Sequence, residues 1–171
     1  MLSRVLILST ALTIVSGVGP AQSAVREGSS DVLGPRPLRE QTRKAAIHDY
    51  LQAWKSLDAA FAQNSAELLD PAFVGGARDV LAETIQQQAA LGIRTHYQDL
   101  AHDLQIAFYS PEGLSIELID KVEYTVQVLD HDTVKTTQQI SARYVIVLTP
   151  AELRWRVRVF QADHESRHIP H

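Results

Sequence analysis

The stretch Leu153-Arg154-Trp155-Arg156-Val157-Arg158-Val159 alternates apolar and basic residues without interruption. This period of two residues is typical of a strand with one buried face. The same period extends back to about residue 95, whereas from about residue 39 to residue 92 apolar residues recur every three or four positions, as on amphipathic helices. Helices followed by strands predict an α+β fold, in which N-terminal helices cover one face of an antiparallel sheet.

Turn-forming residues divide the two halves further. We expect a first helix over about residues 39–62, a short second helix that stops before Pro71, and a third over about 77–91 that ends at Gly92. Four strands are expected, joined by hairpins, over residues 96–109, 114–129, 134–149 and 152–162. The pattern predicts a sheet of four strands or more.

The composition limits the class of protein. A chain of 171 residues with 45% apolar and 21% charged residues is typical of one globular domain. The formal net charge is only −4 and no run of Lys or Arg stands out, which argues against nucleic acid as a partner. Cysteine is absent, which excludes disulfides, thiolate metal sites and a lipoprotein anchor.

The N-terminus has the pattern of a secretory signal peptide over residues 1–23. Arg4 is followed by an apolar stretch from Val5 to Val18 and by the small residues of Ala21-Gln22-Ser23, so we expect cleavage after Ser23. The apolar stretch is shorter than the roughly 20 residues that span a bilayer, and no stable membrane anchor is expected. The sequence thus predicts a periplasmic or secreted protein, with a flexible linker over residues 24–38.

Two parts of the sequence resemble a known family. One is the run Tyr50-Leu51-Gln52-Ala53-Trp54. The other is the closing pair of strands, Tyr144-Val145-Ile146-Val147-Leu148 followed by Arg154-Trp155-Arg156-Val157. The chain resembles the SnoaL-like superfamily, also named after nuclear transport factor 2, over residues 39–162, and residues 163–171 form a polar, His-rich tail. The resemblance implies a curved, cone-shaped sheet with helices on its concave face. Homodimers are common in this superfamily, and some exported relatives and the intermembrane-space domain of plastid division proteins are non-catalytic.

The resemblance also implies a pocket on the concave face, closed by the first helix, that could hold a small hydrophobic ligand. The side chains expected to line it are Tyr50, Trp54, Ile106, Phe108, Tyr124, Tyr144 and Trp155. The alternative is that these residues simply form the core.

Asp120 is the polar exception on the inward face of the second strand, between Leu118 and Val122. If it points inward, it could act as a general base with a tyrosine such as Tyr124 beside it. The favoured interpretation is a β-bulge at Asp120-Lys121 that turns the carboxylate out to solvent, because an unpaired buried carboxylate is strongly destabilising.

Two groups of residues contain possible metal ligands, and neither predicts a metal or another cofactor. His164-Glu165-Ser166-Arg167-His168 matches the H-E-x-x-H pattern of metalloproteases, but it lies in the polar tail without apolar flanks. The second group, His96, Asp99, His102 and Asp103, is interpreted as the polar rim of a strand, since His96 and His102 would lie about 20 Å apart along it. In a helix, Asp99 could instead meet His102 or Asp103.

The outward face of the sheet is more apolar than solvation requires. Ile119, Val145, Val147 and Phe160 are expected there, and they predict the interface of a homodimer. The sequence therefore favours an exported, non-catalytic binding module that contacts a small hydrophobic ligand or an exported protein. The alternative is a small isomerase, dehydratase or hydrolase with Asp120 as its general base.

Overall fold

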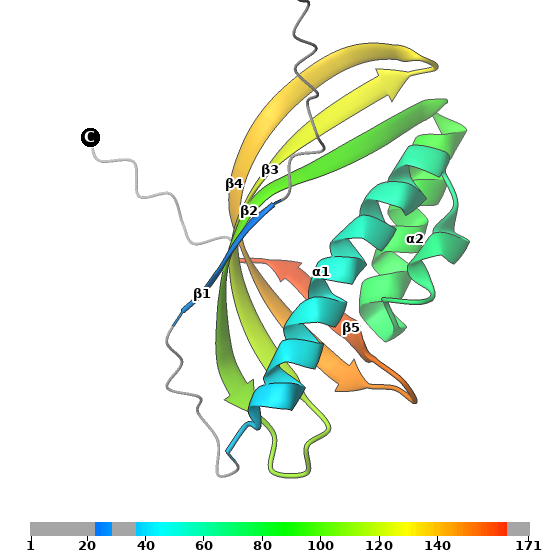
Figure 1. The fold of residues 1–171 in the computed structure, drawn as a ribbon. Coiled ribbons are helices and arrows are strands. Elements are labelled where there is room, and N and C mark those ends of the chain that lie inside the picture. Colours follow the sequence, from blue (N-terminus) through cyan, green and yellow to red (C-terminus); the bar gives the residue numbers. More distant parts are fainter. Residues whose placement is uncertain (1–22, 29–36, 164–171) are drawn as a thin grey trace, which may run out of the picture.

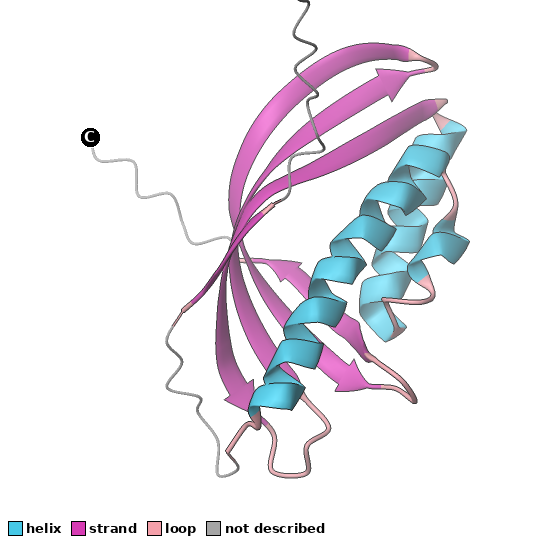
Figure 2. Cartoon of the chain, in the orientation of Figure 1, coloured by secondary structure: helices cyan, strands magenta, loops and turns pink. Residues whose placement is uncertain are grey.

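Residues 23–28 and 37–163 are described by the structure, a computed structural model (Figure 1). Its elements follow the chain in this order: β1 (Ala24–Glu27), α1 (Glu40–Gln63), the 3-10 helix η1 (Ala66–Leu69), α2 (Gly75–Ala90), β2 (Ile93–Tyr109), β3 (Ile116–Asp130), β4 (Thr133–Pro150) and β5 (Trp155–Ala162). The strands form one sheet in the order β1-β2-β3-β4-β5. β1 runs parallel to β2, and all other neighbours are antiparallel. The predicted α+β class, with helices on the concave face of a curved antiparallel sheet, is confirmed (Figure 2).

Helix α1 forms because its apolar side chains recur at helical spacing along one face. Ile47, Tyr50, Trp54, Leu57 and Phe61 are all buried. The helix itself crosses the concave side of the sheet (Figure 1). The helix ends at Asn64, which adopts a left-handed conformation with φ of 53°. Helix α1 thus covers the concave face of the sheet and determines which of its side chains enter the interior of the cone.

Helix α2 ends as the sequence predicts. Gly92 follows it with φ of 70°, a conformation that glycine adopts without steric strain, and its carbonyl accepts a hydrogen bond from the amide of His131 at 3.4 Å. Within the described part of the chain, no helix combines the length and the apolar character that crossing a bilayer requires.

Bulges change which side chains of a strand face the helices. Leu100 and Ala107 in β2 have no partner in β3, and Arg158 in β5 has none in β4. Each extra residue shifts the alternation by one position, so odd and even numbers exchange faces. The prediction that odd-numbered and even-numbered residues keep to the same two faces along a whole strand was therefore wrong beyond each bulge.

Two predicted positions are corrected by these bulges. Phe108 is paired with Glu117 and is 37% exposed, so it lies on the outward face and not in the cone. Phe160, expected on the outward face, stacks on Tyr144 and contacts Trp54 and Phe73 in the interior.

Strand β1 lies in the segment that was expected to be a flexible linker. Its four residues pair in parallel with residues 101–104 of β2, which covers the outer edge of that strand. The linker prediction was therefore wrong for Ala24–Glu27.

Candidate functional site

Asp120 lies in the middle of β3 and points into the cone. Its exposed fraction is 0%, and the register between β2 and β3 is regular at this residue. The predicted bulge at Asp120-Lys121, which would have turned the carboxylate to solvent, was therefore wrong. A fully buried carboxylate requires partners, because burial of an unpaired charge is costly.

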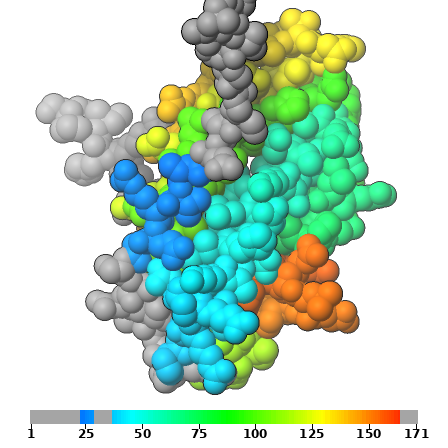
Figure 3. Space-filling model, viewed as in Figure 1, coloured from blue at the N-terminus to red at the C-terminus, as the bar shows by residue number. Residues whose placement is uncertain are grey.

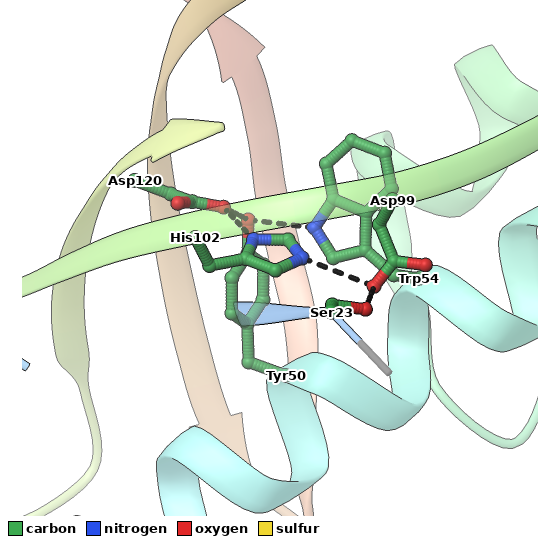
Figure 4. Close-up of polar contacts among 6 residues, drawn as sticks. All are labelled: Ser23, Tyr50, Trp54, Asp99, His102 and Asp120. Carbon is green, nitrogen blue, oxygen red and sulfur yellow. Dashed lines mark hydrogen bonds and ion pairs between the residues drawn. The ribbon is translucent and has the colours of Figure 1, made fainter. Parts of the chain in front are cut away.

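The carboxylate of Asp120 has two close partners (Figure 4). Its Oδ2 accepts a hydrogen bond of 2.6 Å from the hydroxyl of Tyr50 on α1, and it lies 2.7 Å from Nδ1 of His102 on β2. The indole Nε1 of Trp54, one turn after Tyr50, donates to the Tyr50 hydroxyl at 2.9 Å. Helix α1 and strands β2 and β3 are thus joined by one chain of polar contacts.

The bulge at Leu100 extends this chain to Asp99. In a regular strand, residues three apart point to opposite faces, but the extra residue places Asp99 and His102 on the same side. Nε2 of His102 lies 3.3 Å from Oδ2 of Asp99, and the same oxygen accepts a hydrogen bond of 2.5 Å from Ser23. His102 is therefore held between two carboxylates.

Electrostatics favour the charged form of His102. Burial lowers the pKa of this imidazole, but hydrogen bonds and charge interactions with Asp120 and Asp99 outweigh burial and raise the pKa to about 9. The hydrogen bond from His102 is the main reason that the pKa of Asp99 falls to about 2. At neutral pH the site therefore contains an imidazolium, and the pKa of Tyr50 is raised well above its usual value by burial and by Asp120.

One carboxylate oxygen of Asp120 has no hydrogen-bond partner among the described residues. This oxygen, Oδ1, is buried, although Oδ2 has two partners. Such an oxygen needs a water molecule or a ligand group to be satisfied. A carboxylate, an imidazolium and a tyrosine hydroxyl within contact distance are also groups that can perform acid–base chemistry.

The expected aromatic lining is a packed cluster centred on Trp54. Its indole contacts the rings of Tyr124, Tyr144 and Phe160 at centroid distances of 5.4, 5.9 and 5.6 Å. The hydroxyls of Tyr124 and Tyr144 lie 3.1 Å apart and face each other, so Tyr50, and not Tyr124, is the tyrosine bound to Asp120. Ile106 is buried in the core, and Trp155 packs against its edge.

Several grooves lie on the outside of the described part of the molecule. A groove of about 430 Å³ between α2 and β5 is lined mostly by apolar residues, which include Ala77, Val80, Leu81 and Phe160. We call the linked residues Tyr50, Trp54, Asp99, His102 and Asp120 the buried cluster. In contrast to the grooves, its interior is closed off: Tyr50, His102 and Trp54 are 0%, 1% and 4% exposed.

The outward face keeps three of the four residues predicted for a dimer interface. Ile119 is paired with Val145, and Val147 is paired with Val159, which the bulge at Arg158 turns outward in place of Phe160. All four residues of this patch, Ile119, Val145, Val147 and Val159, are half-buried in the single chain. We refer to them as the outer patch.

Of the four strand residues considered as metal ligands, Asp99 and His102 come together, at 3.3 Å, and His102 is buried and not at a polar rim. Within residues 23–28 and 37–163, no group of three or more His, Asp or Glu side chains is arranged to hold a metal ion. The H-E-x-x-H sequence of the tail lies outside the described residues. His96 contacts Asp58 instead of the cluster, at 3.5 Å.

No protein-family model matches the sequence, and no curated protein is similar to it. Solved structures do match. The intermembrane space region of the chloroplast protein ARC6 superposes with a TM-score of 0.59 and 14% identity, over 74% of this chain and 98% of that one. A protein from Catenulispora acidiphila gives a TM-score of 0.50 at 11% identity, over 72% and 94%. At such identities the likeness shows the fold alone: the chain has a curved α+β cone fold, the fold that the resemblance to the SnoaL-like superfamily implied.

Proposed function

We propose that the chain is an exported, non-catalytic binding or interaction module that acts through its outer surface. The observation that carries this proposal is the closed interior. Asp120 and Tyr50 are fully buried, and His102 is 1% exposed.

A general acid or base must come within hydrogen-bond distance of the group that it protonates or deprotonates. In this protein, Nδ1 of His102 and the Tyr50 hydroxyl are both directed at Oδ2 of Asp120, and Nε2 of His102 faces Asp99. Their hydrogen-bonding capacity is used within the protein. This arrangement supports a structural role, in which the cluster fixes α1 against β2 and β3.

The outer patch supports association with a second copy of the chain. Ile119, Val145, Val147 and Val159 form two cross-strand pairs on three adjacent strands, so they make one continuous apolar surface. A two-fold arrangement would pair this surface with itself and remove it from water. We therefore propose a homodimer that forms through the outer patch.

Export is the second part of the proposal, and it rests on the N-terminal sequence. Arg4, the apolar stretch over residues 5–18 and Ala21-Gln22-Ser23 have the order of a cleavable signal peptide. Sequencing the N-terminus of the protein from the periplasmic or secreted fraction tests it. We expect the chain to begin at Ala24, whereas an intact Met1 would refute export by this route.

Native mass spectrometry of the protein purified from its own host tests the function. We expect the mass of two processed chains, with no added mass from an enclosed small molecule. A small molecule retained by the wild-type protein and lost on substitution of Asp120 would contradict the non-catalytic proposal.

Val145→Asp tests the interface separately. A carboxylate at the centre of the outer patch would be buried without a partner in the dimer, so we expect this variant to be monomeric in sedimentation equilibrium while its helical circular dichroism is kept. Val134→Asp is the matched control, because Val134 lies at the other end of the same strand and is 49% exposed. A wild-type monomer at tens of micromolar, or equal dissociation of both variants, would refute the proposed interface.

An enzyme is the second candidate, and one observation favours it. The unpartnered Oδ1 of Asp120 lies beside a charged imidazole in an apolar cone, and Asp120 could serve as a general base if α1 moved away. This function requires that a small hydrophobic molecule enter the cone. The retained ligand described above would be its first sign.

A further inference from the structure

The chain segment just before β1 touches the buried cluster. The Ser23 hydroxyl donates a hydrogen bond of 2.5 Å to Oδ2 of Asp99, the oxygen that also faces His102 (Figure 4). Ser23 is the last residue before the cleavage position expected from the sequence, and Ala24 is the first residue of β1. The peptide bond that would be cut therefore adjoins a residue bound to the cluster.

The other end of β1 is fixed independently. The Arg43 guanidinium on α1 lies 3.1 Å from the Glu27 carboxylate and 3.4 Å from the carbonyl oxygen of Gly28, and the Gly28 amide donates to the Leu104 carbonyl at 2.9 Å. β1 and α1 lie side by side on one face of the molecule (Figure 3). Because all four β1 side chains are exposed, contacts at its two ends matter for holding this short strand in place.

The charges of the cluster leave room for another cation. His102 is the ion-pair partner of both Asp99 and Asp120 among the described residues, so one imidazolium serves two carboxyl groups. The remaining group that faces Asp120 is the Tyr50 hydroxyl, and the remaining group at Asp99 is the Ser23 hydroxyl. Asp99 is also the more accessible of the two acids, with 27% of its side chain exposed.

We propose that, after cleavage following Ser23, the Asp99 carboxylate binds the new α-ammonium group of Ala24 in place of the Ser23 hydroxyl. This contact then fixes the mature N-terminus to the sheet. The inference rests on the proposed export. Hydrolysis adds one water molecule across the Ser23–Ala24 peptide bond: the Ser23 carboxylate leaves with the signal segment, and the Ala24 amine takes up a proton. The cluster thereby exchanges a neutral donor for a charged one.

The old and the new hydrogen-bond donors to Asp99 lie close together in the chain. The Ser23 hydroxyl and the Ala24 nitrogen belong to adjacent residues, and the pairing of Ala24 with Ala101 keeps that nitrogen next to the strand that carries Asp99. A charge-assisted hydrogen bond is also stronger than a bond between neutral groups. Processing would thus hold β1 more firmly than the uncut chain does.

The test is an NMR titration of the Ala24 amine, followed by its methyl carbon shift, in protein that begins at Ala24. A bound carboxylate favours the ammonium form, so we expect a pKa at least one unit above the usual 7.7–8.0 of an α-amino group. Asp99→Asn should return it to that range. Asp103→Asn, the same change at an exposed residue of the same strand, should leave it raised. An ordinary pKa in the wild-type protein would overturn the inference.

A second measurement avoids dependence on the folding of the Asp99 variant. Acetylation of the Ala24 amine removes its charge, and we expect faster amide hydrogen exchange in residues 101–104 of β2, where β1 pairs. Unchanged exchange would also overturn the inference. The two proposals fail separately: a different N-terminus in the exported protein contradicts the cleavage, whereas a chain that begins at Ala24 with an ordinary amine contradicts only the role of Asp99.

Discussion

Tyr50→Phe tests whether the buried cluster stabilises the fold. The substitution keeps the ring and removes the hydroxyl that donates to Asp120 and accepts from Trp54. A hydrogen bond to a charged group contributes about 1.5–3 kcal/mol, and a buried donor without a partner costs about 1–3 kcal/mol. With partial relaxation we expect a loss of about 3–5 kcal/mol in the free energy of unfolding.

The matched control is Tyr124→Phe, which removes a hydroxyl of the same kind from the same interior. Its partner is the neutral hydroxyl of Tyr144 at 3.1 Å, so the expected loss is about 0.5–1.5 kcal/mol. Urea unfolding at pH 7, followed by circular dichroism, measures both variants. Equal midpoints with unchanged slopes would refute the reasoning that the contact with Asp120 carries more energy than an ordinary core hydrogen bond.

Three further outcomes are expected. The pKa of His102 is raised from 6.5 to about 9 in the folded state, so the charged imidazole adds ~3 kcal/mol to the free energy of unfolding below pH 6.5. This stabilisation is lost as the pH rises through 9, and an imidazole titration midpoint near 6.5 by NMR would contradict it. Gly92→Ala should destabilise by about 1–2 kcal/mol because of its positive φ, whereas Gly76→Ala, with open space around the new methyl group, should be neutral or stabilising by about 0.4–1 kcal/mol in urea melts. Trp54→Ala should cost about 3–5 kcal/mol, and a loss below 1 kcal/mol would show that the aromatic cluster is not the core.

Much of the architecture follows from periodicity alone. The spacing of Ile47, Tyr50 and Trp54 predicts the buried face of α1, and alternation predicts the four long strands and their hairpins. Strand β1 escaped prediction because four exposed residues have no apolar pattern, and their place in the sheet depends on backbone pairing and on Arg43.

The contact between His102 and Asp99 depends on a bulge, a feature that periodicity cannot reveal. A bulge adds one residue to a strand, and no particular residue type is needed for it. Leu100 is a common strand residue, so the sequence does not identify it as the bulged position. A physical signal was nevertheless present. An acid at an inward position requires a partner nearby, and His102 is the basic residue of the neighbouring strand within reach of Asp120. Considered as a pair, the two residues would have favoured an inward Asp120.

The position of the cluster also bears on what the cone can do. A molecule that entered the interior would have to displace Tyr50 or Trp54, and it would have to replace the hydrogen bonds that these residues make at Asp120. Each unreplaced bond would cost about 1–3 kcal/mol, and a movement of α1 would also disrupt the packing of the aromatic rings around Trp54. The outer patch needs no such rearrangement, because Val145 and Val147 pair with β3 in regular register and lie on the outward face. The same interactions that hold α1 in place therefore favour binding on the outside of the cone.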